Sequence, residues 1–481
     1  MSNTPESTIG TTSGSRSPSG RFAPSAGYSL RIELAAAAAA TMADVVRAIT
    51  ACGADIREMH TTDDGNRVLH VACSSTAQQD CVRAAIGTAP GAKARSIGDA
   101  TFELHRGGKV GIVAKAMVRN ADELAMAYTP GVGRVSSAIA ADPSLSWTFT
   151  GRSNSVAVLS DGSAVLGLGN IGPEAAMPVM EGKAVLFRQF AGIDAYPICI
   201  NASSADEIVA VAKAIAPSFG GINLEDIAAP ICFEVEARLQ AELDIPVFHD
   251  DQHGTAIVVL AAIRNAAKAV GKNLAEMTVV VVGAGAAGLA CAKLLDLVGA
   301  GNIIGVDREG ILHESVLGQT TSCSKWWFAE HGNRDQRTGS IADALKGADV
   351  LLGLSGPGVI EPEWLELMAD DAIVCAMANP IPEIMPELIP ANVAVMATGR
   401  SDYPNQINNV LAFPGVFRGM LDVRATQCTD EMKLAAAEAL AAMVPKPTTD
   451  RILPGAFEPG VADVVAGAVA RTARAQGCIR P

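Results

Sequence analysis

The chain has 481 residues, of which 49% are hydrophobic and 18% charged. This composition excludes wholesale disorder and is typical of a globular protein with about two to four domains. Asp and Glu total 51 against 37 Lys and Arg, so the formal net charge is −14. An acidic chain without a Lys/Arg-rich block binds nucleic acid or an anionic membrane poorly, so we expect neither as a partner.

The cysteines and the N-terminal residues indicate the compartment. The 10 cysteines are scattered and include no Cys-x-x-Cys pair, which predicts reduced thiols rather than a disulfide framework. No apolar segment follows the N-terminal residues as it would in a secretory signal, and no apolar stretch is long enough to span a membrane. We therefore expect a cytoplasmic protein.

The first hundred or so residues predict a tail and a small domain. Residues 1–26 are rich in Ser, Thr, Gly and Pro and are expected to be a disordered tail. Residues 27–107 follow the strand and helix order βαββαβ of the ferredoxin-like split motif. In pattern and size this segment resembles an ACT domain, a regulatory module that often pairs with a second copy and binds a small effector between them. The predicted elements are Tyr28–Leu34, Thr41–Cys52, Asp55–Thr62, Arg67–Ser74, Thr76–Ile86 and Ala92–Leu104.

Beyond a polar hinge at His105–Lys109, the pattern is that of an α/β protein. Residues 108–271 alternate helical stretches with short apolar runs. From residue 272 the alternation is regular, which predicts a parallel sheet with helices on both faces, and residues 272–440 are therefore expected to form a Rossmann-type doubly wound domain. Residues 441–481 are expected to be a helical segment that packs back on the preceding domains. The predicted strands are Thr278–Val282, Asn302–Val306, Val350–Leu354, Ile373–Met377 and Val393–Thr398.

A glycine fingerprint lies at the start of this domain. Gly283–Gly288 has the pattern G-x-G-x-x-G between an apolar strand and a helix, and Asp307 ends the next strand. This context predicts a dinucleotide site, with pyrophosphate at the helix N-terminus and the acid on ribose hydroxyls. Asp307 favours NAD, while Arg308 beside it leaves NADP open. The expected cofactor-binding residues are Gly283, Gly285, Ala286, Ala287, Gly288, Asp307, Arg308, Ser355 and Asn379.

The same glycine pattern occurs once more, at Gly167–Gly172. No acid follows it at the right distance, and prolines interrupt the following segment. It is predicted to be a tight loop rather than a second nucleotide site.

Two acidic pairs, Glu225-Asp226 and Asp250-Asp251, each follow an apolar run. Two such pairs in one cleft could hold Mg²⁺ or Mn²⁺, which prefer carboxylate and water oxygens. Either pair alone is better explained as an acidic helix start. Lys183 lies in a mostly apolar segment that could make it a base, and Tyr128 precedes a Pro-Gly turn. A surface lysine and a packing tyrosine are the simpler alternatives.

Taken together, these motifs occur in the order seen in malic enzymes. The matching segments are Leu124–Val132, Pro178–Phe187, Asn223–Ile227, Phe248–Thr255, the Gly283 fingerprint and Gly399–Asn409. From about residue 108 to the C-terminus the chain resembles the shorter bacterial type of this family. The resemblance implies that residues 108–271 are the substrate and metal domain and residues 272–440 the NAD(P) domain.

The resemblance also implies a role for each candidate residue. Tyr128 would be the general acid, Lys183 the general base, and Asp250 the group that orients Lys183. The implied metal ligands are Glu225, Asp226 and Asp251, and the implied substrate contacts are Lys183, Asn379 and Asn409. This chain departs from the family at one position. Longer malic enzymes carry an arginine for the substrate carboxylate in the stretch equivalent to Ser160–Leu166, and this chain has Ala164 where that arginine would fall. Lys183 or a residue of a partner subunit would then neutralise the second carboxylate of malate.

The implied reaction is oxidative decarboxylation of (S)-malate to pyruvate and CO₂, with NAD or NADP and Mg²⁺ or Mn²⁺, in a homodimer or higher homo-oligomer. Two alternatives stay open. One is a redox-neutral malolactic-type enzyme that converts malate to lactate. The other is a non-catalytic nucleotide-sensing protein, although a sensor would not need the lysine, the tyrosine and the acidic residues together.

Overall fold

A computed structural model describes residues 25–36, 38–316 and 322–480. The chain divides into two compact units, residues 1–109 and 110–481. Most of the tail expected at residues 1–26 lies outside the described residues, while Ser25 and Ala26 already belong to the first strand. Within the part of the chain that the structure describes, no helix is long and apolar enough to cross a membrane.

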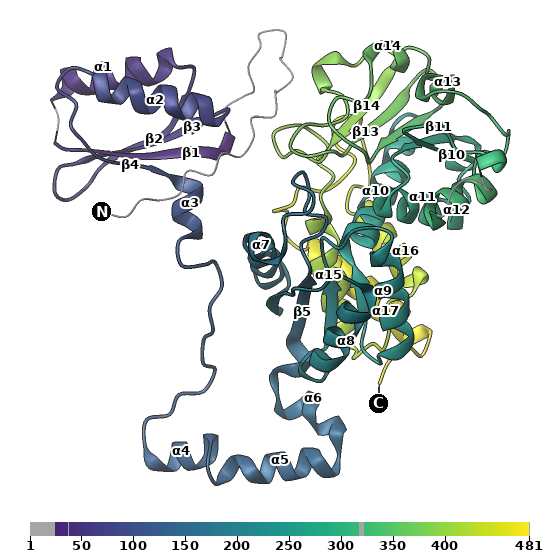
Figure 1. Cartoon of the computed structure of the whole chain (residues 1–481), viewed down its shortest axis with the longest axis horizontal. Helices are drawn as coiled ribbons and strands as arrows, with labels where there is room; N and C mark the ends of the chain where they lie inside the picture. Colours follow the sequence, from purple (N-terminus) through teal and green to yellow (C-terminus); the bar gives the residue numbers. More distant parts are fainter. Residues whose placement is uncertain (1–24, 37, 317–321, 481) are drawn as a thin grey trace. The chain divides into compact units, whose positions relative to one another are not determined.

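The N-terminal unit has the element order βαββαβ followed by one short helix. Its four strands pair antiparallel in the order β2-β3-β1-β4, and both longer helices lie on one face of the sheet (Figure 1). Their apolar side chains, among them Val45 and Val82, are buried against Leu30 and Ile32 of β1. The elements are β1 (Ser25–Leu34), α1 (Ala39–Ala51), β2 (Asp55–Thr61), β3 (Arg67–Cys73), α2 (Thr76–Thr88), β4 (Ala94–Asp99) and α3 (Ala100–His105).

Two predictions for this unit are wrong. The strand expected over Ala92–Leu104 ends at Asp99, because the Asp99 carboxylate accepts the backbone N–H groups of Thr101 (2.8 Å) and Phe102 (3.3 Å) and so starts a helix. The cysteines are not all unpaired, since a disulfide joins Cys52 to Cys81. Spacing along the chain did not predict this pair because the packing of α1 beside α2 creates it.

The second unit contains one parallel sheet and one mostly parallel sheet, and the first of them carries Glu225, Asp226, Asp250 and Asp251 at its edge. Its strand order is β6-β5-β7-β8. Its strands are β5 (Ser155–Ser160), β6 (Asp194–Cys199), β7 (Gly221–Leu224) and β8 (Val247–His249), and the helices of this region are α6 (Ser146–Phe149), α7 (Pro173–Ala191), α8 (Ala205–Ile215), α9 (Ile231–Glu242) and α10 (Asp250–Ala269).

The second sheet has the strand order β11-β10-β9-β12-β13-β14, with every pair parallel except β10 and β11. All five predicted strands are present to within one residue. The strands are β9 (Thr278–Val282), β10 (Asn302–Asp307), β11 (Gly310–Ile311), β12 (Val350–Gly353), β13 (Ala372–Ala376) and β14 (Val393–Thr398), and the helices are α11 (Ala286–Leu297), α12 (Cys323–His331), α13 (Ile341–Leu345) and α14 (Pro362–Leu365). Apolar strands buried on both faces are typical of such sheets.

Three helices follow the second sheet: α15 (Phe413–Asp422), α16 (Asp430–Ala442) and α17 (Val461–Ala475). They pack against one another and against α7 and α10 of the first sheet's region. One continuous apolar core includes Val156 of β5, Val279 of β9 and Val469 of α17. The two sheets and the C-terminal helices are therefore held together by a shared core.

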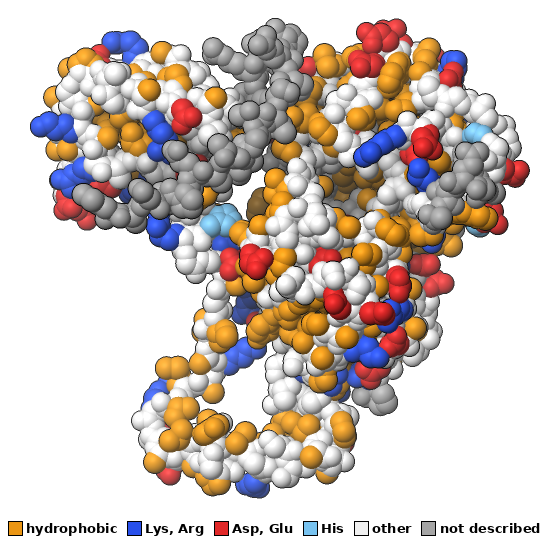
Figure 2. All heavy atoms as spheres, in the orientation of Figure 1, with side chains coloured by type: hydrophobic (Ala, Val, Ile, Leu, Met, Phe, Trp, Pro, Cys, Tyr) orange, Lys and Arg blue, Asp and Glu red, His pale blue; other side chains and the backbone are white. Residues whose placement is uncertain are grey.

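The start of the second unit is different. We call residues 110–142 the arm; it contains α4 (Ala121–Ala127) and α5 (Gly131–Ala141). None of its residues is buried, and hydrophobic side chains lie along it (Figure 2), including Ile112, which is 94% exposed. The arm therefore presents an apolar surface that the rest of the described chain leaves uncovered. Short helices without a buried face are only marginally stable in water.

Candidate functional site

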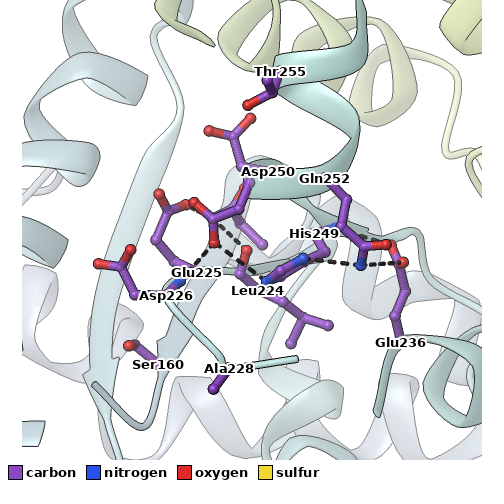
Figure 3. Close-up of polar contacts among 12 residues, drawn as sticks. Ser160, Leu224, Glu225, Asp226, Ala228, Glu236, His249, Asp250, Gln252 and Thr255 are labelled. Carbon is purple, nitrogen blue, oxygen red and sulfur yellow. Dashed lines mark hydrogen bonds and ion pairs between the residues drawn. The ribbon is translucent and has the colours of Figure 1, made fainter. Parts of the chain in front are cut away.

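Four carboxylates meet where β7 and β8 end. These strands are parallel neighbours, and Leu224 pairs with His249 at their carboxyl ends. Glu225 and Asp226 follow Leu224, whereas Asp250 and Asp251 form the first turn of α10 directly after His249. Adjacent parallel strands therefore bring the two acidic pairs predicted from sequence to one edge of the sheet, as Figure 3 shows for Glu225, Asp226 and Asp250.

Three of these residues, Glu225, Asp226 and Asp251, have carboxylate oxygens within 4.8 Å of one another. The backbone N–H of Asp226 donates to Oδ2 of Asp251 at 2.8 Å, which holds the two acidic segments together. Asp226 has a φ of 54°, a left-handed conformation that costs energy for a non-glycine residue and is concentrated at functional sites.

The donor set fits a hard divalent cation. Burial raises the pKa of Glu225 well above its usual range, and burial together with Asp251 raises the pKa of Asp226 to about 7. Oδ2 of Asp226 is buried and makes no hydrogen bond to any described residue. A buried cluster of carboxylates with an unpartnered oxygen is stabilised by a cation such as Mg²⁺ or Mn²⁺.

Lys183 of α7 lies inside the same cluster. Its Nζ is 2.5 Å from Oδ2 of Asp250 and 2.9 Å from Oε1 of Glu225, and it stands 4.2 Å over the ring of Phe413. Burial alone would lower the pKa of Lys183, but the two carboxylates outweigh burial and raise it. The lysine side chain is therefore only 10% exposed and is paired with two carboxylates, and the surface alternative is wrong.

Polar neighbours fix the orientation of these groups. Asn409 donates from Nδ2 to Oδ2 of Asp250 at 3.3 Å and accepts from Thr255 at 3.1 Å. Asn223 donates to Oε2 of Glu225 at 2.8 Å. Of these, only Asn409 was predicted as a site residue. Thr255 and Asn223 lie inside quoted motifs, while Phe413 had no signal in the sequence.

The glycine fingerprint has the geometry expected of it. A Cβ on Gly283 would lie 2.3 Å from the carbonyl oxygen of Leu354, and one on Gly288 would lie 2.0 Å from that of Gly283, so glycine is required at both positions. Gly285 caps α11, and Ala286 and Ala287 are its first residues.

Asp307 ends β10, where an acid that binds ribose would stand. Its carboxylate forms an ion pair with Lys325 of α12, whereas Arg308 is exposed. The sequence did not reveal Lys325 because it belongs to a different element.

Two further loops reach the same edge of the second sheet. Ser355 follows β12, and Asn379 precedes a cis peptide bond to Pro380 after β13. The buried carboxylate of Glu383 accepts the backbone N–H groups of Ser355 (2.8 Å) and Ala378 (2.9 Å). Glu383 thus ties together the loops of two predicted cofactor residues, a role that sequence reasoning missed.

The second glycine pattern is a loop, as predicted. Val165 and Gly169 pair across it, and a Cβ on Gly167 would lie 2.9 Å from the carbonyl oxygen of Asn379. Ala164 donates its backbone N–H to the carbonyl oxygen of Asp226 at 2.9 Å. The position that lacks the arginine therefore adjoins the carboxylate cluster and supplies no charge to it.

Tyr128 is the predicted residue that the chain does not bring to the site. It caps α4 on the arm, and its side chain is 68% exposed. Among the described residues, no hydrogen bond or ion pair joins Tyr128 to Lys183 or to the carboxylates.

Two family models match this chain. The model described as "Malic enzyme, N-terminal domain" matches residues 107–240, and that described as "Malic enzyme, NAD binding domain" matches residues 252–474. The chain belongs to the malic enzyme family. The fingerprint and the carboxylate cluster of this malic enzyme family member fall in or beside the two matched regions.

Proteins similar to this chain carry names that include malic enzyme. The chain is 50% identical to an NAD-dependent malic enzyme of Geobacillus stearothermophilus over 92% of this chain and 93% of the relative. It is 50% identical to a bifunctional malic/malolactic enzyme of Bacillus subtilis over 80% of this chain and 95% of the relative. The crystal structure of the malic enzyme of Pyrococcus horikoshii superposes with a TM-score of 0.75 at 47% identity, covering 79% of this chain and 91% of that one.

Proposed function

We propose that this protein is a metal-dependent malic enzyme that converts (S)-malate to pyruvate and CO₂ while reducing NAD or NADP. The observation that carries the proposal is the buried Lys183, held between Glu225 and Asp250 beside a three-carboxylate cluster. A base next to a divalent metal site is the arrangement needed to oxidise a 2-hydroxy acid at C2.

In this proposal, Glu225, Asp226 and Asp251 would hold Mg²⁺ or Mn²⁺. When bound, the cation would withdraw electron density from the C2 oxygen of malate and share the charge of Glu225, which together with Asp250 raises the pKa of Lys183. Lys183 then takes the proton of the C2 hydroxyl as hydride leaves C2 for the nicotinamide. Asp250 and Asn409 keep Lys183 in place during this transfer, and Tyr128 protonates C3 after CO₂ has left.

Tyr128 can play this part only if the arm reaches an active site. We infer that the arm packs on a second copy of the chain and that Tyr128 completes the site of that copy. The arm's apolar and wholly unburied character supports this, since an apolar surface of this extent marks a protein interface. The expected homodimer follows from the same argument.

The cofactor choice depends on Asp307 and Lys325. A free carboxylate at the end of β10 would accept hydrogen bonds from ribose hydroxyls and repel a 2′-phosphate. The ion pair with Lys325 reduces that repulsion and places a cation beside Asp307. We therefore propose that NAD is used and that NADP is accepted.

A malolactic reaction is the second candidate function, because one relative is named as a bifunctional malic/malolactic enzyme. The test is an initial-rate assay with malate, Mn²⁺ and either NAD or NADP, in which pyruvate, lactate and reduced cofactor are all quantified. Pyruvate and reduced cofactor in equal amounts support the proposal. Lactate without net cofactor reduction would instead establish the malolactic reaction.

For the N-terminal unit, we propose an ACT-like fold that binds a small-molecule effector. Support comes from the βαββαβ order and the antiparallel strand order β2-β3-β1-β4. The match to the Geobacillus enzyme spans 92% of this chain, which is more than residues 110–481 supply, so the relative shares part of this unit.

A further inference from the structure

A buried chain of hydrogen bonds runs from α9 to the metal-binding cluster and is not used by the proposed chemistry. It consists of Glu236, Gln252 and His249, which Figure 3 shows in a row beside Glu225 and Asp226. All three side chains are buried. Buried polar groups of this kind are costly unless each has its partners, so the order of donors and acceptors along the chain can be worked out.

The chain begins at a carboxylate that is ionised. Glu236 accepts the backbone N–H of His249 at 3.0 Å and lies 2.9 Å from Nε2 of His253. Burial would raise the pKa of Glu236, but the neighbouring His253, His249 and Lys433 outweigh burial and lower it to about 2. Glu236 can therefore only accept hydrogen bonds.

This fixes the orientation of Gln252. The side-chain atom of Gln252 that lies 3.1 Å from Oε2 of Glu236 must be its amide nitrogen, because two oxygens would repel each other. The same nitrogen is 3.0 Å from Nδ1 of His249. An amide nitrogen only donates, so Nδ1 of His249 accepts and the ring carries its hydrogen on Nε2.

Nε2 of His249 lies beside the carboxylate cluster. Nε2 of His249 lies 3.3 Å from Oδ2 of Asp251 and makes no hydrogen bond within the described residues. The same Oδ2 already accepts the backbone N–H of Asp226. One backbone donor bonds Oδ2 of Asp251, and Nε2 of His249 lies within 3.3 Å of the same oxygen. The other oxygen, Oδ1, is then the one available to a cation.

We propose that Glu236, Gln252 and His249 act as positioning residues that set the tautomer of His249 and thereby hold Asp251 in the orientation of a metal ligand. This rests on the proposed metal site. Hydrogen-bond partners of metal ligands typically change metal affinity by about 10–100-fold when they are removed.

The test measures Mn²⁺ binding by the full-length protein without substrate, with free Mn²⁺ counted by electron paramagnetic resonance. Gln252→Met keeps the side-chain length and removes the donor, and it should raise the Kd for Mn²⁺ by about 10–100-fold. His249→Gln keeps an N–H near the position of Nε2 and should stay much closer to the wild type. Gln240→Met is the matched control, because Gln240 donates only to the backbone oxygen of Val247 and lies outside the chain of bonds.

A second measurement reads the tautomer itself. In protein with ¹⁵N-labelled histidine, the His249 signals, assigned by their loss in His249→Gln, should show a hydrogen on Nε2 in the wild type and predominantly on Nδ1 in Gln252→Met. A hydrogen on Nδ1 in the wild type, or Mn²⁺ affinity in folded Gln252→Met within twofold of wild type, would overturn the inference. A wild type that binds no Mn²⁺ would instead overturn the proposed metal site.

Discussion

Lys183 is the residue on which the proposed chemistry depends most. Replacing it by alanine should lower kcat by about 10²–10⁴, the usual contribution of a positioned base. Cofactor binding should be unchanged, because Lys183 contacts Asp250, Glu225 and Phe413 rather than the glycine loop. Steady-state kinetics with a cofactor titration measures both.

Lys213→Ala is the matched control, since Lys213 is a half-exposed lysine that pairs with Glu242 away from the cluster. Wild-type kcat in Lys183→Ala would remove the lysine from the mechanism.

The ionised Glu236 predicts a pH dependence of stability. Its pKa falls from an ordinary 4.5 to about 2 on folding, so its stabilising contribution is complete above pH 4.5 and is lost as the pH falls from 4.5 toward 2. The free energy of unfolding should therefore fall less steeply over this window in Glu236→Gln than in the wild type. Chemical denaturation at a series of pH values measures the slope.

Glu438→Gln, at an exposed glutamate that pairs with Arg264, should keep the wild-type slope. Equal slopes in the wild type and Glu236→Gln would show that Glu236 is not held ionised by its neighbours.

At the residue scale, sequence reasoning found groups that stand in short motifs. The glycines and Asp307 of the fingerprint could be predicted because each follows from strand, turn and helix in immediate succession. Glu383 and Gln252 could not be assigned their roles. Glu383 acts on Ser355 from 28 positions away, and the role of Gln252 follows only from its contact with Glu236 on another helix.

At the element scale, the parallel strands were predictable because apolar runs bounded by glycine, proline and charge mark buried strands. The end of β4 was not, because a single capping carboxylate, that of Asp99, converts an apparent strand continuation into α3. The exposure of the arm could not be predicted from the sequence either. Its helices could be expected from pattern, but their lack of any buried residue is a property of the folded chain.

The arm carries its own prediction. If its apolar side chains are buried by a second copy, Val113→Asp should place a charge in that interface and shift the protein toward monomer, with loss of activity. Analytical ultracentrifugation and the malate assay on the same samples measure both effects.

Ser218→Asp, at an exposed polar position outside the arm, is the control for added charge. An unchanged mass and an unchanged rate in Val113→Asp would contradict the proposed packing.

At the scale of the whole molecule, the two units predict separable roles. Deleting residues 1–107 should leave the malate reaction intact, because every candidate catalytic and cofactor residue belongs to the unit that starts at residue 110. Any effector response should be lost, and in the intact protein it should change malate affinity by roughly 5–150-fold. Metabolites and amino acids titrated against both proteins measure this difference.

The same effector response in both proteins would place regulation in the catalytic unit. It would also leave the N-terminal unit without the proposed regulatory role.

The central claim is that Lys183 of one copy works with Tyr128 of another in a metal-dependent malate reaction. Mixing Tyr128→Phe with Lys183→Ala and letting the subunits exchange tests it directly. Each variant alone should be nearly inactive, whereas exchange creates dimers in which one site has both wild-type residues. For a symmetric dimer the 1:1 mixture should recover about a quarter of the wild-type rate. A mixture that exchanges subunits, verified by mass, but stays as inactive as its components would contradict the account.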